Sequence, residues 1–138
     1  MLKCARPDVQ IICAEPENAS ILAGKSWNLH EIQGWAPNFV PSVLDQSVID
    51  RLHPINETLG RDTERRLAAE EGIFAGISAG ATLATALEVA KTAPEGSVLL
   101  AMLPDTGERY LSTFLMEGVN DGSDDEWLAS LETAPEMA

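Results

Sequence analysis

The chain has 138 residues, of which 45% are apolar, and its formal net charge is −13. Its length suits one globular domain and is too short for two ordinary ones, and its apolar content excludes an intrinsically disordered protein. No apolar run approaches the roughly 20 residues of a membrane span, and the acidic balance argues against nucleic-acid binding, which needs clustered lysine and arginine.

The first 41 residues predict a helix end, a strand, a short helix and a loop. Residues 1–5 have the form of a last helical turn stopped by a proline, so we expect the chain to be a piece of a longer protein. Residues 9–14 form a nearly continuous apolar run that ends before Pro16, as a buried strand does. A short helix is expected over 17–23, and glycine and proline make residues 25–41 a loop.

The next part alternates strands with helices. A strand is expected over 48–55, followed by a helix over 56–71 with an asparagine cap and a closing glycine. A brief strand over 73–75 leads into a helix over 78–91, and 97–103 is the clearest strand pattern of the chain. In the helix over 56–71, three residues are expected on the buried side: Leu59, Leu67 and Ala68.

The last 22 residues differ in composition from the rest. They contain seven acidic residues and no basic one, as a solvated acidic tail does. We therefore expect an α/β domain over 1–116 and a tail over 117–138. Residues 123–126 have the form of a capping box, which predicts a short helix containing Trp127, Leu128 and Leu131.

Strands that alternate with helices predict the α/β class, with a partial parallel, Rossmann-like sheet covered by helices on both faces. Half of such a sheet exposes strand edges, so we expect a homo-oligomer, in the simplest case a dimer. The two cysteines, Cys4 and Cys13, form no disulfide framework, and Cys13 is expected to be a small core residue. With no signal peptide, this indicates a reducing, cytoplasmic setting.

Residues 76–80, Gly-Ile-Ser-Ala-Gly, lie where a strand gives way to a helix. The glycines permit close backbone approach, and Ser78 lies at or near the helix N-cap. Plain helix capping is one interpretation. The other is a binding role, because a serine hydroxyl that accepts from backbone N–H groups still has a proton to donate to a ligand. Neither the dinucleotide nor the P-loop glycine pattern is present.

Two further segments carry distinctive residues. Residues 104–113, Pro-Asp-Thr-Gly-Glu-Arg-Tyr-Leu-Ser-Thr, follow the predicted strand over 97–103; a surface turn explains the proline and the glycine but not the whole string. Residues 30–41 form either a ligand-facing loop or a hydrophobic loop anchored by Trp35 and Phe39. No metal site is expected, because His30 and His53 have no cysteine or carboxylate at ligand spacing.

In order and spacing, these three segments resemble cysteine synthase (O-acetylserine sulfhydrylase), a family of fold-type II pyridoxal-phosphate enzymes. The resemblance runs from about Val9 to Phe114 and implies the C-terminal portion of that fold. By resemblance, Ser78 donates to the pyridine nitrogen of the cofactor, Gly34 belongs to the loop that faces cofactor and substrate, and Asp105 and Thr106 line the ring-nitrogen side. The implied reaction replaces the acetate of O-acetylserine by sulfide and gives L-cysteine, which suits a ring nitrogen that faces a neutral hydroxyl. Trp35 to Asn38 depart from the family's glycine-rich form and make the loop bulkier.

The chain contains only part of what such chemistry needs. Its lysines are Lys3, Lys25 and Lys91, and none has the family's Ser-x-x-Lys-Asp context. We therefore assign no catalytic residue, and we expect the chain alone to be inactive and not to bind pyridoxal phosphate covalently. Two alternatives stay open: a non-catalytic module that self-associates or binds serine acetyltransferase, and a piece of a cystathionine β-synthase-like enzyme, which the alanine at 79 resembles.

Overall fold

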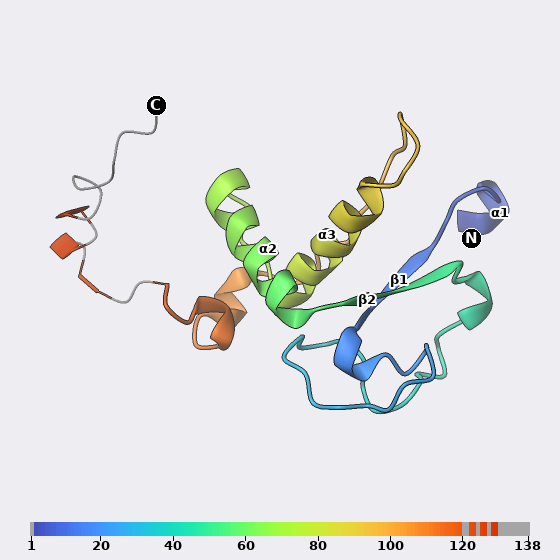
Figure 1. Ribbon diagram of the computed structural model, residues 1–138, viewed down its shortest axis with the longest axis horizontal. Helices are drawn as coiled ribbons and strands as arrows, with labels where there is room; N and C mark the ends of the chain where they lie inside the picture. Colours follow the sequence, from blue (N-terminus) through green and yellow to red (C-terminus); the bar gives the residue numbers. More distant parts are fainter. Residues whose placement is uncertain (1, 120–121, 124, 127, 130–138) are drawn as a thin grey trace.

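The computed structural model describes residues 2–119, 122–123, 125–126 and 128–129. Among these residues, two parallel strands and two long helices form an α/β unit, joined by loops and short helical turns (Figure 1). The elements are α1 (Leu2–Ala5), β1 (Ile12–Pro16), η1 (Glu17–Ala19), η2 (Gln46–Val48), β2 (Arg51–Ile55), α2 (Glu57–Glu71), α3 (Ile77–Ala90), η3 (Gly107–Tyr110) and η4 (Phe114–Met116).

The sheet is formed by β1 and β2, which pair in parallel from Ile12 opposite Arg51 to Pro16 opposite Ile55. The two strands run side by side in Figure 1, and α3 contacts both of them. Parallel pairing against a packed helix confirms the α/β class expected from the sequence.

Helix α2 begins and ends where the sequence predicts. The Asn56 side chain accepts hydrogen bonds from two backbone N–H groups of the first turn, at 2.9 and 3.4 Å, and Gly72 ends the helix at a φ of 69°. The buried side is only partly as expected. Leu67 is buried and Ala68 is half-buried, but Leu59 is 42% exposed.

Helices α2 and α3 pack closely because glycine lies at their contact. A β-carbon on Gly80 of α3 would lie 2.2 Å from the Gly60 carbonyl oxygen and 2.5 Å from the Glu64 β-carbon. A β-carbon on Gly60 would lie 3.1 Å from that of Ala81. The backbones of the two helices therefore approach to a distance that only glycine at position 80 permits.

Three expected elements differ in the structure. Residues 97–103 are not a strand among the described residues, and residues 73–75 form only an isolated antiparallel bridge between Ala75 and Thr106. The helix expected over 17–23 is a single 3-10 turn over Glu17–Ala19. A strand requires a hydrogen-bonded neighbour as well as an apolar sequence, and 97–103 has no such neighbour in the described part of the chain. Three of its side chains are largely exposed: Val98 (96%), Leu100 (90%) and Met102 (69%).

The main core cluster joins the sheet, α3 and the short turns η3 and η4. Its buried members are Ile32, Ile55, Ile77, Ala81, Ala84, Tyr110 and Leu115, with Trp35, Phe114 and Met116 packed against them. This cluster connects segments that lie far apart in the sequence, so it holds the loop before β2 against the start of α3.

The acidic tail contains the predicted capping box. The Ser123 N–H donates to Glu126 Oε2 at 2.7 Å, and the Glu126 N–H donates to Ser123 Oγ at 3.3 Å, which is the reciprocal arrangement of that motif. Trp127 and Leu131 of the expected helix lie outside the described residues, and the domain division after residue 116 stays a prediction. None of the described helices is long and apolar enough to cross a membrane.

Candidate functional site

Ser78 lies in the first turn of α3, but it is not the helix cap. Gly76 occupies the N-cap position without a side-chain hydrogen bond, and the helix begins at Ile77. The expectation that Ser78 caps the helix is therefore wrong, because its backbone already has helical geometry. The residue is 5% exposed, and its hydroxyl, for which no hydrogen bond is found among the described residues, is not one of the fully buried polar atoms that lack a partner. The Ser78 hydroxyl thus retains its donor capacity for a ligand.

The structure brings the segment 104–113 against the residues that precede α3. Thr106 pairs with Ala75 in the antiparallel bridge, and the Gly107 N–H donates to the Phe74 carbonyl at 3.2 Å. The following turn, η3, places the ring of Tyr110 against the backbone at position 76. Two of the three segments singled out in the sequence therefore meet at the start of α3.

Asp105 is held by three donors in a strained backbone conformation. Its φ is 67°, in the left-handed region, where aspartate is more readily tolerated than most residues. The carboxylate accepts from the Thr106 N–H at 2.9 Å and the Tyr110 hydroxyl at 3.0 Å, and it pairs with Arg109 at 3.0 Å. The Thr106 N–H, with help from Tyr110 and Arg109, lowers the pKa of Asp105. Its carboxylate is thus committed to shaping the turn.

Tyr110 is the functional neighbour that the sequence interpretation missed. It is buried and closes the turn by donating to Asp105. Burial, followed by the bond to Asp105, raises the pKa of the phenol, so the hydroxyl stays protonated at neutral pH. The sequence offered one signal for this role, the place of Tyr110 within residues 104–113, because a buried tyrosine hydroxyl usually has a hydrogen-bond partner.

The loop over residues 30–41 borders a different part of the structure, a cavity beside β1. Ile32 is fully buried in the core cluster and Trp35 packs against that cluster, whereas Phe39 is 63% exposed and does not anchor the loop. Gly34 has a φ of 86° and lines a cavity of about 280 Å³ together with Cys13 and Glu15 of β1. The core cluster joins this loop to α3 through Ile32.

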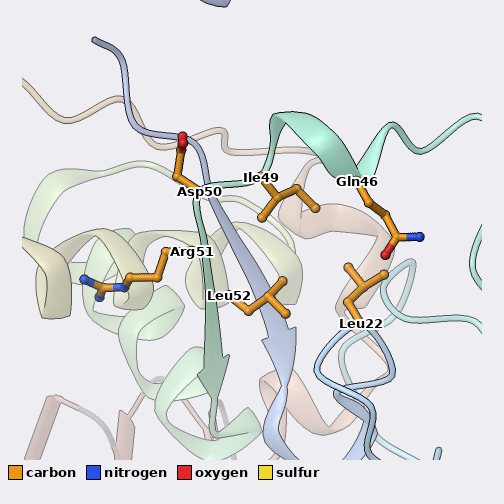
Figure 2. Close-up of a pocket in the computed structure, with 6 residues that line it drawn as sticks. All are labelled: Leu22, Gln46, Ile49, Asp50, Arg51 and Leu52. Carbon is orange, nitrogen blue, oxygen red and sulfur yellow. The ribbon is translucent and has the colours of Figure 1, made fainter. Parts of the chain in front are cut away.

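A second, smaller cavity of about 150 Å³ lies at the start of β2. Figure 2 shows the side chains of Leu22, Ile49 and Leu52 on one side of this strand, with Arg51 on the other side. Asp50 accepts from the Ile11 N–H at 2.7 Å and pairs with the Lys3 ammonium group, so its carboxylate joins β2 to the preceding elements. None of the four residues predicted for the site lines this cavity.

Pyridoxal phosphate requires partners for its aldehyde carbon, its phosphate and its ring nitrogen. The Ser78 hydroxyl, which has a proton to donate, fits the ring nitrogen. The lysines do not fit the aldehyde: Lys3 pairs with Asp50 and Lys91 with Glu88, both outside the site, and Lys25 is exposed. The described residues therefore suit one side of the cofactor only.

No protein-family model matches the chain. Over 133 residues the chain is 69% identical to O-ureido-L-serine synthase of Streptomyces lavendulae, in a match that covers 96% of the chain and 41% of that enzyme. Over 113 residues it is 37% identical to cysteine synthase of Staphylococcus aureus, covering 82% of the chain and 36% of that enzyme.

The comparison with solved structures agrees with the comparison of sequences. A crystal structure of O-ureido-L-serine synthase with bound O-ureido-L-serine matches with a TM-score of 0.91 and 68% identity, covering 98% of this chain and 42% of that chain. The chain therefore spans about two-fifths of the length of the relatives that it matches.

Proposed function

The chain belongs to the cysteine-synthase family of fold-type II pyridoxal-phosphate enzymes, and from this premise we propose that it forms the ring-nitrogen side of a β-replacement active site. The observation that carries the proposal is the position of Ser78 in the first turn of α3, where the residue is 5% exposed and its hydroxyl bonds to no described residue. Such a hydroxyl can donate its proton to a ligand atom that accepts a hydrogen bond.

Each predicted residue has a role in this proposal. Ser78 donates to the ring nitrogen, Asp105 and Thr106 line the same side, and Gly34 belongs to the loop that faces the substrate. When bound, pyridoxal phosphate supplies an electron sink for cleavage at the β-carbon of the amino acid. A neutral hydroxyl does not hold the ring nitrogen protonated, so the cofactor would be a weaker electron sink, which suits elimination of a β-substituent.

The nucleophile is the finer part of the proposal. A β-replacement that makes O-ureido-L-serine needs a nucleophile whose oxygen carries the ureido group, that is hydroxyurea, and it releases acetate if the donor is O-acetylserine. The identity of 69% with O-ureido-L-serine synthase favours this nucleophile over sulfide.

A graft tests the assignment. The matched segment of the Streptomyces lavendulae enzyme would be replaced by this chain, and the hybrid would be supplied with pyridoxal phosphate, O-acetylserine and either hydroxyurea or sulfide. We expect O-ureido-L-serine as the main product and a loss of kcat of at least about tenfold on Ser78→Ala. A hybrid that makes only cysteine would refute the choice of nucleophile, and full activity of the Ser78→Ala hybrid would refute the role of Ser78.

The chain without the graft is expected to be inactive, because none of its lysines fits the aldehyde of the cofactor. The same mixture with the 138-residue chain should give no product and no absorption band of covalently bound cofactor. Product formation that Ser78→Ala abolishes would overturn this expectation.

We further propose that the chain self-associates as a homodimer through residues 97–103. Val98 and Leu100 are 96% and 90% exposed, and contiguous exposed apolar residues mark interaction sites. Analytical ultracentrifugation should give a dimer that Leu100→Lys converts to monomer. Val43→Lys is the matched control, because Val43 is 93% exposed but lies in another part of the chain. A monomeric wild-type chain would contradict the proposal.

Binding of serine acetyltransferase is proposed from the family resemblance alone. The C-terminal peptide of that enzyme should bind the graft near Gly34 and compete with O-acetylserine. Calorimetry with the peptide, with its residues in scrambled order as the control, would test this; equal heats for both peptides would refute it.

A further inference from the structure

Glu64 is a charged residue type in a fully buried position. It lies on α2, and its side chain is 0% exposed. One carboxyl oxygen, Oε1, accepts a hydrogen bond from the Ala75 N–H at 3.2 Å, and the other, Oε2, is buried without any hydrogen-bond partner among the described residues. Burial of such a group lowers the stability of the fold, because one backbone hydrogen bond does not compensate for the desolvation of an ionised carboxylate.

No cation forms an ion pair with this carboxyl among the residues that the structure describes. Arg65, the next residue, directs its guanidinium away and donates to the carbonyl oxygens of residues 114, 115 and 117. In α3 the only ionisable residue is Glu88, which pairs with Lys91, and residues 73–76 contain none. In the segment that packs on 74–76, Tyr110 and Arg109 are both engaged by Asp105.

Burial raises the pKa of Glu64, opposed by the bond from Ala75 and the more distant charge of Arg65. A neutral carboxyl group needs no counter-ion, so the arrangement around Glu64 suits the protonated acid better than the carboxylate. The protonated form still accepts the Ala75 N–H at one oxygen.

The close packing of α3 against α2 fixes where the Glu64 side chain lies. Gly80 of α3 packs so close to Glu64 that a β-carbon there would lie 2.5 Å from the Glu64 β-carbon. Ala75, whose N–H donates this hydrogen bond, precedes Ser78 by three positions and pairs with Thr106. A single buried hydrogen bond therefore connects α2 to the residue at which the two site segments meet.

We propose that Glu64 is a positioning residue for this site: its buried carboxyl group holds Ala75 and thereby sets the placement of Ser78 relative to Thr106. The part of the proposal that concerns the site rests on the proposed function. The hold on Ala75 itself is a property of the chain without any ligand.

Amide hydrogen exchange in the 138-residue chain tests the hold on Ala75. Glu64→Met keeps the volume but removes the acceptor, and we expect the protection factors of the Ala75 and Gly107 amides to fall at least tenfold. Glu64→Gln keeps an acceptor without a titrating proton and should retain that protection. Asp62→Asn is the matched control, because Asp62 is exposed on the same helix. Unchanged protection in Glu64→Met, or its loss in Glu64→Gln, would overturn the proposal.

A pH series supplies a readout that packing alone would not move. A carboxyl with a raised pKa stabilises the fold while protonated, and this contribution is lost as the pH rises through its folded pKa. The free energy of unfolding of the wild type should therefore fall, relative to that of Glu64→Gln, as the pH rises above the ordinary range of a carboxyl group. Parallel curves for these two folded proteins would overturn the proposal, even if Glu64→Met failed to fold.

The graft separates this proposal from the proposed function. We expect Glu64→Met to lower kcat about tenfold and Glu64→Gln to leave it within about twofold of the parent, because small displacements of catalytic groups are costly. If Ser78→Ala has no effect on the graft, the proposed function fails while the exchange result stands. If Ser78→Ala lowers the kcat of the graft and Glu64→Met leaves it unchanged, the positioning role of Glu64 is refuted.

Discussion

The ring of Tyr110 occupies the space that a side chain at Gly76 would need. A β-carbon on Gly76 would lie 2.6 Å from Tyr110 Cε2 and 3.0 Å from Cζ, both atoms of a rigid ring. The φ of Gly76 is −85°, which any residue can adopt. The requirement for glycine here is therefore set by packing against the tyrosine rather than by backbone conformation.

Gly76→Ala should destabilise the chain by about 1 to 3 kcal/mol, because the ring cannot move without leaving the core. Urea denaturation of the single variants Gly76→Ala and Tyr110→Leu, and of the double variant, measures the coupling. We expect Gly76→Ala to cost clearly less in the Tyr110→Leu background. Equal costs in both backgrounds would mean that the contact is not the cause.

Arg65→Ala should destabilise the chain by about 2 to 3 kcal/mol, since its guanidinium makes charge-assisted bonds to three carbonyl groups in and directly after η4. Arg66→Ala is the matched control on the same helix. Arg66 makes a solvent-exposed i,i+4 pair with Glu70, and pairs of this kind contribute little to stability. Thermal or urea unfolding compares the two; similar losses would contradict the specific role of Arg65.

The lowered pKa of Asp105 predicts that the chain loses stability in acid. Its pKa is lowered in the fold by the Thr106 N–H, the Tyr110 hydroxyl and Arg109. A carboxylate with a lowered pKa adds stability above its unfolded pKa of about 3.9 and loses it as the pH falls through the folded value. The urea midpoint of the wild type should therefore drop further between pH 6 and pH 3 than that of Asp105→Asn. Asparagine tolerates the positive φ at this position, so equal drops would show that the charge has no part in the effect.

Ser78→Ala should leave the stability of the chain within about 1 kcal/mol of the wild type, because its hydroxyl bonds to no described residue and alanine favours a helix. Ser20→Ala is the contrasting variant, since the buried Ser20 hydroxyl donates to the Pro16 carbonyl at 2.8 Å. We expect the second change to cost about 1 kcal/mol. A large loss on Ser78→Ala would indicate a structural role for this serine and weaken the case for a ligand.

The features that could be predicted from the sequence are those that depend on near neighbours. The asparagine at 56 and the glycine at 72 bound α2 as predicted, and the Ser123–Glu126 capping box forms its two hydrogen bonds. In each case, the residues that determine the geometry lie within one or two helical turns of each other, so their spacing in the sequence contains the necessary information.

The features that could not be predicted depend on distant segments. The apolar residues of 97–103 have the pattern of a strand, but pairing requires a neighbour that no local pattern identifies. Leu59 has the periodicity of a buried residue, yet the contact with α3 falls on Gly60 instead. In the site, the pairing of Ala75 with Thr106 and the burial of Glu64 arise from packing between elements, and neither is visible in the residues around them.

The close α2–α3 contact has a kinetic consequence. These helices are adjacent in the sequence, whereas β1 and β2 must close the long loop between them, and local contacts form with less loss of chain entropy. The helical pair is therefore expected to form the folding nucleus, with strand pairing later. Ala84→Gly in α3 should mainly slow refolding in stopped-flow measurements, and Ile55→Val in β2 should mainly speed unfolding. The reverse pattern would place the nucleus in the sheet.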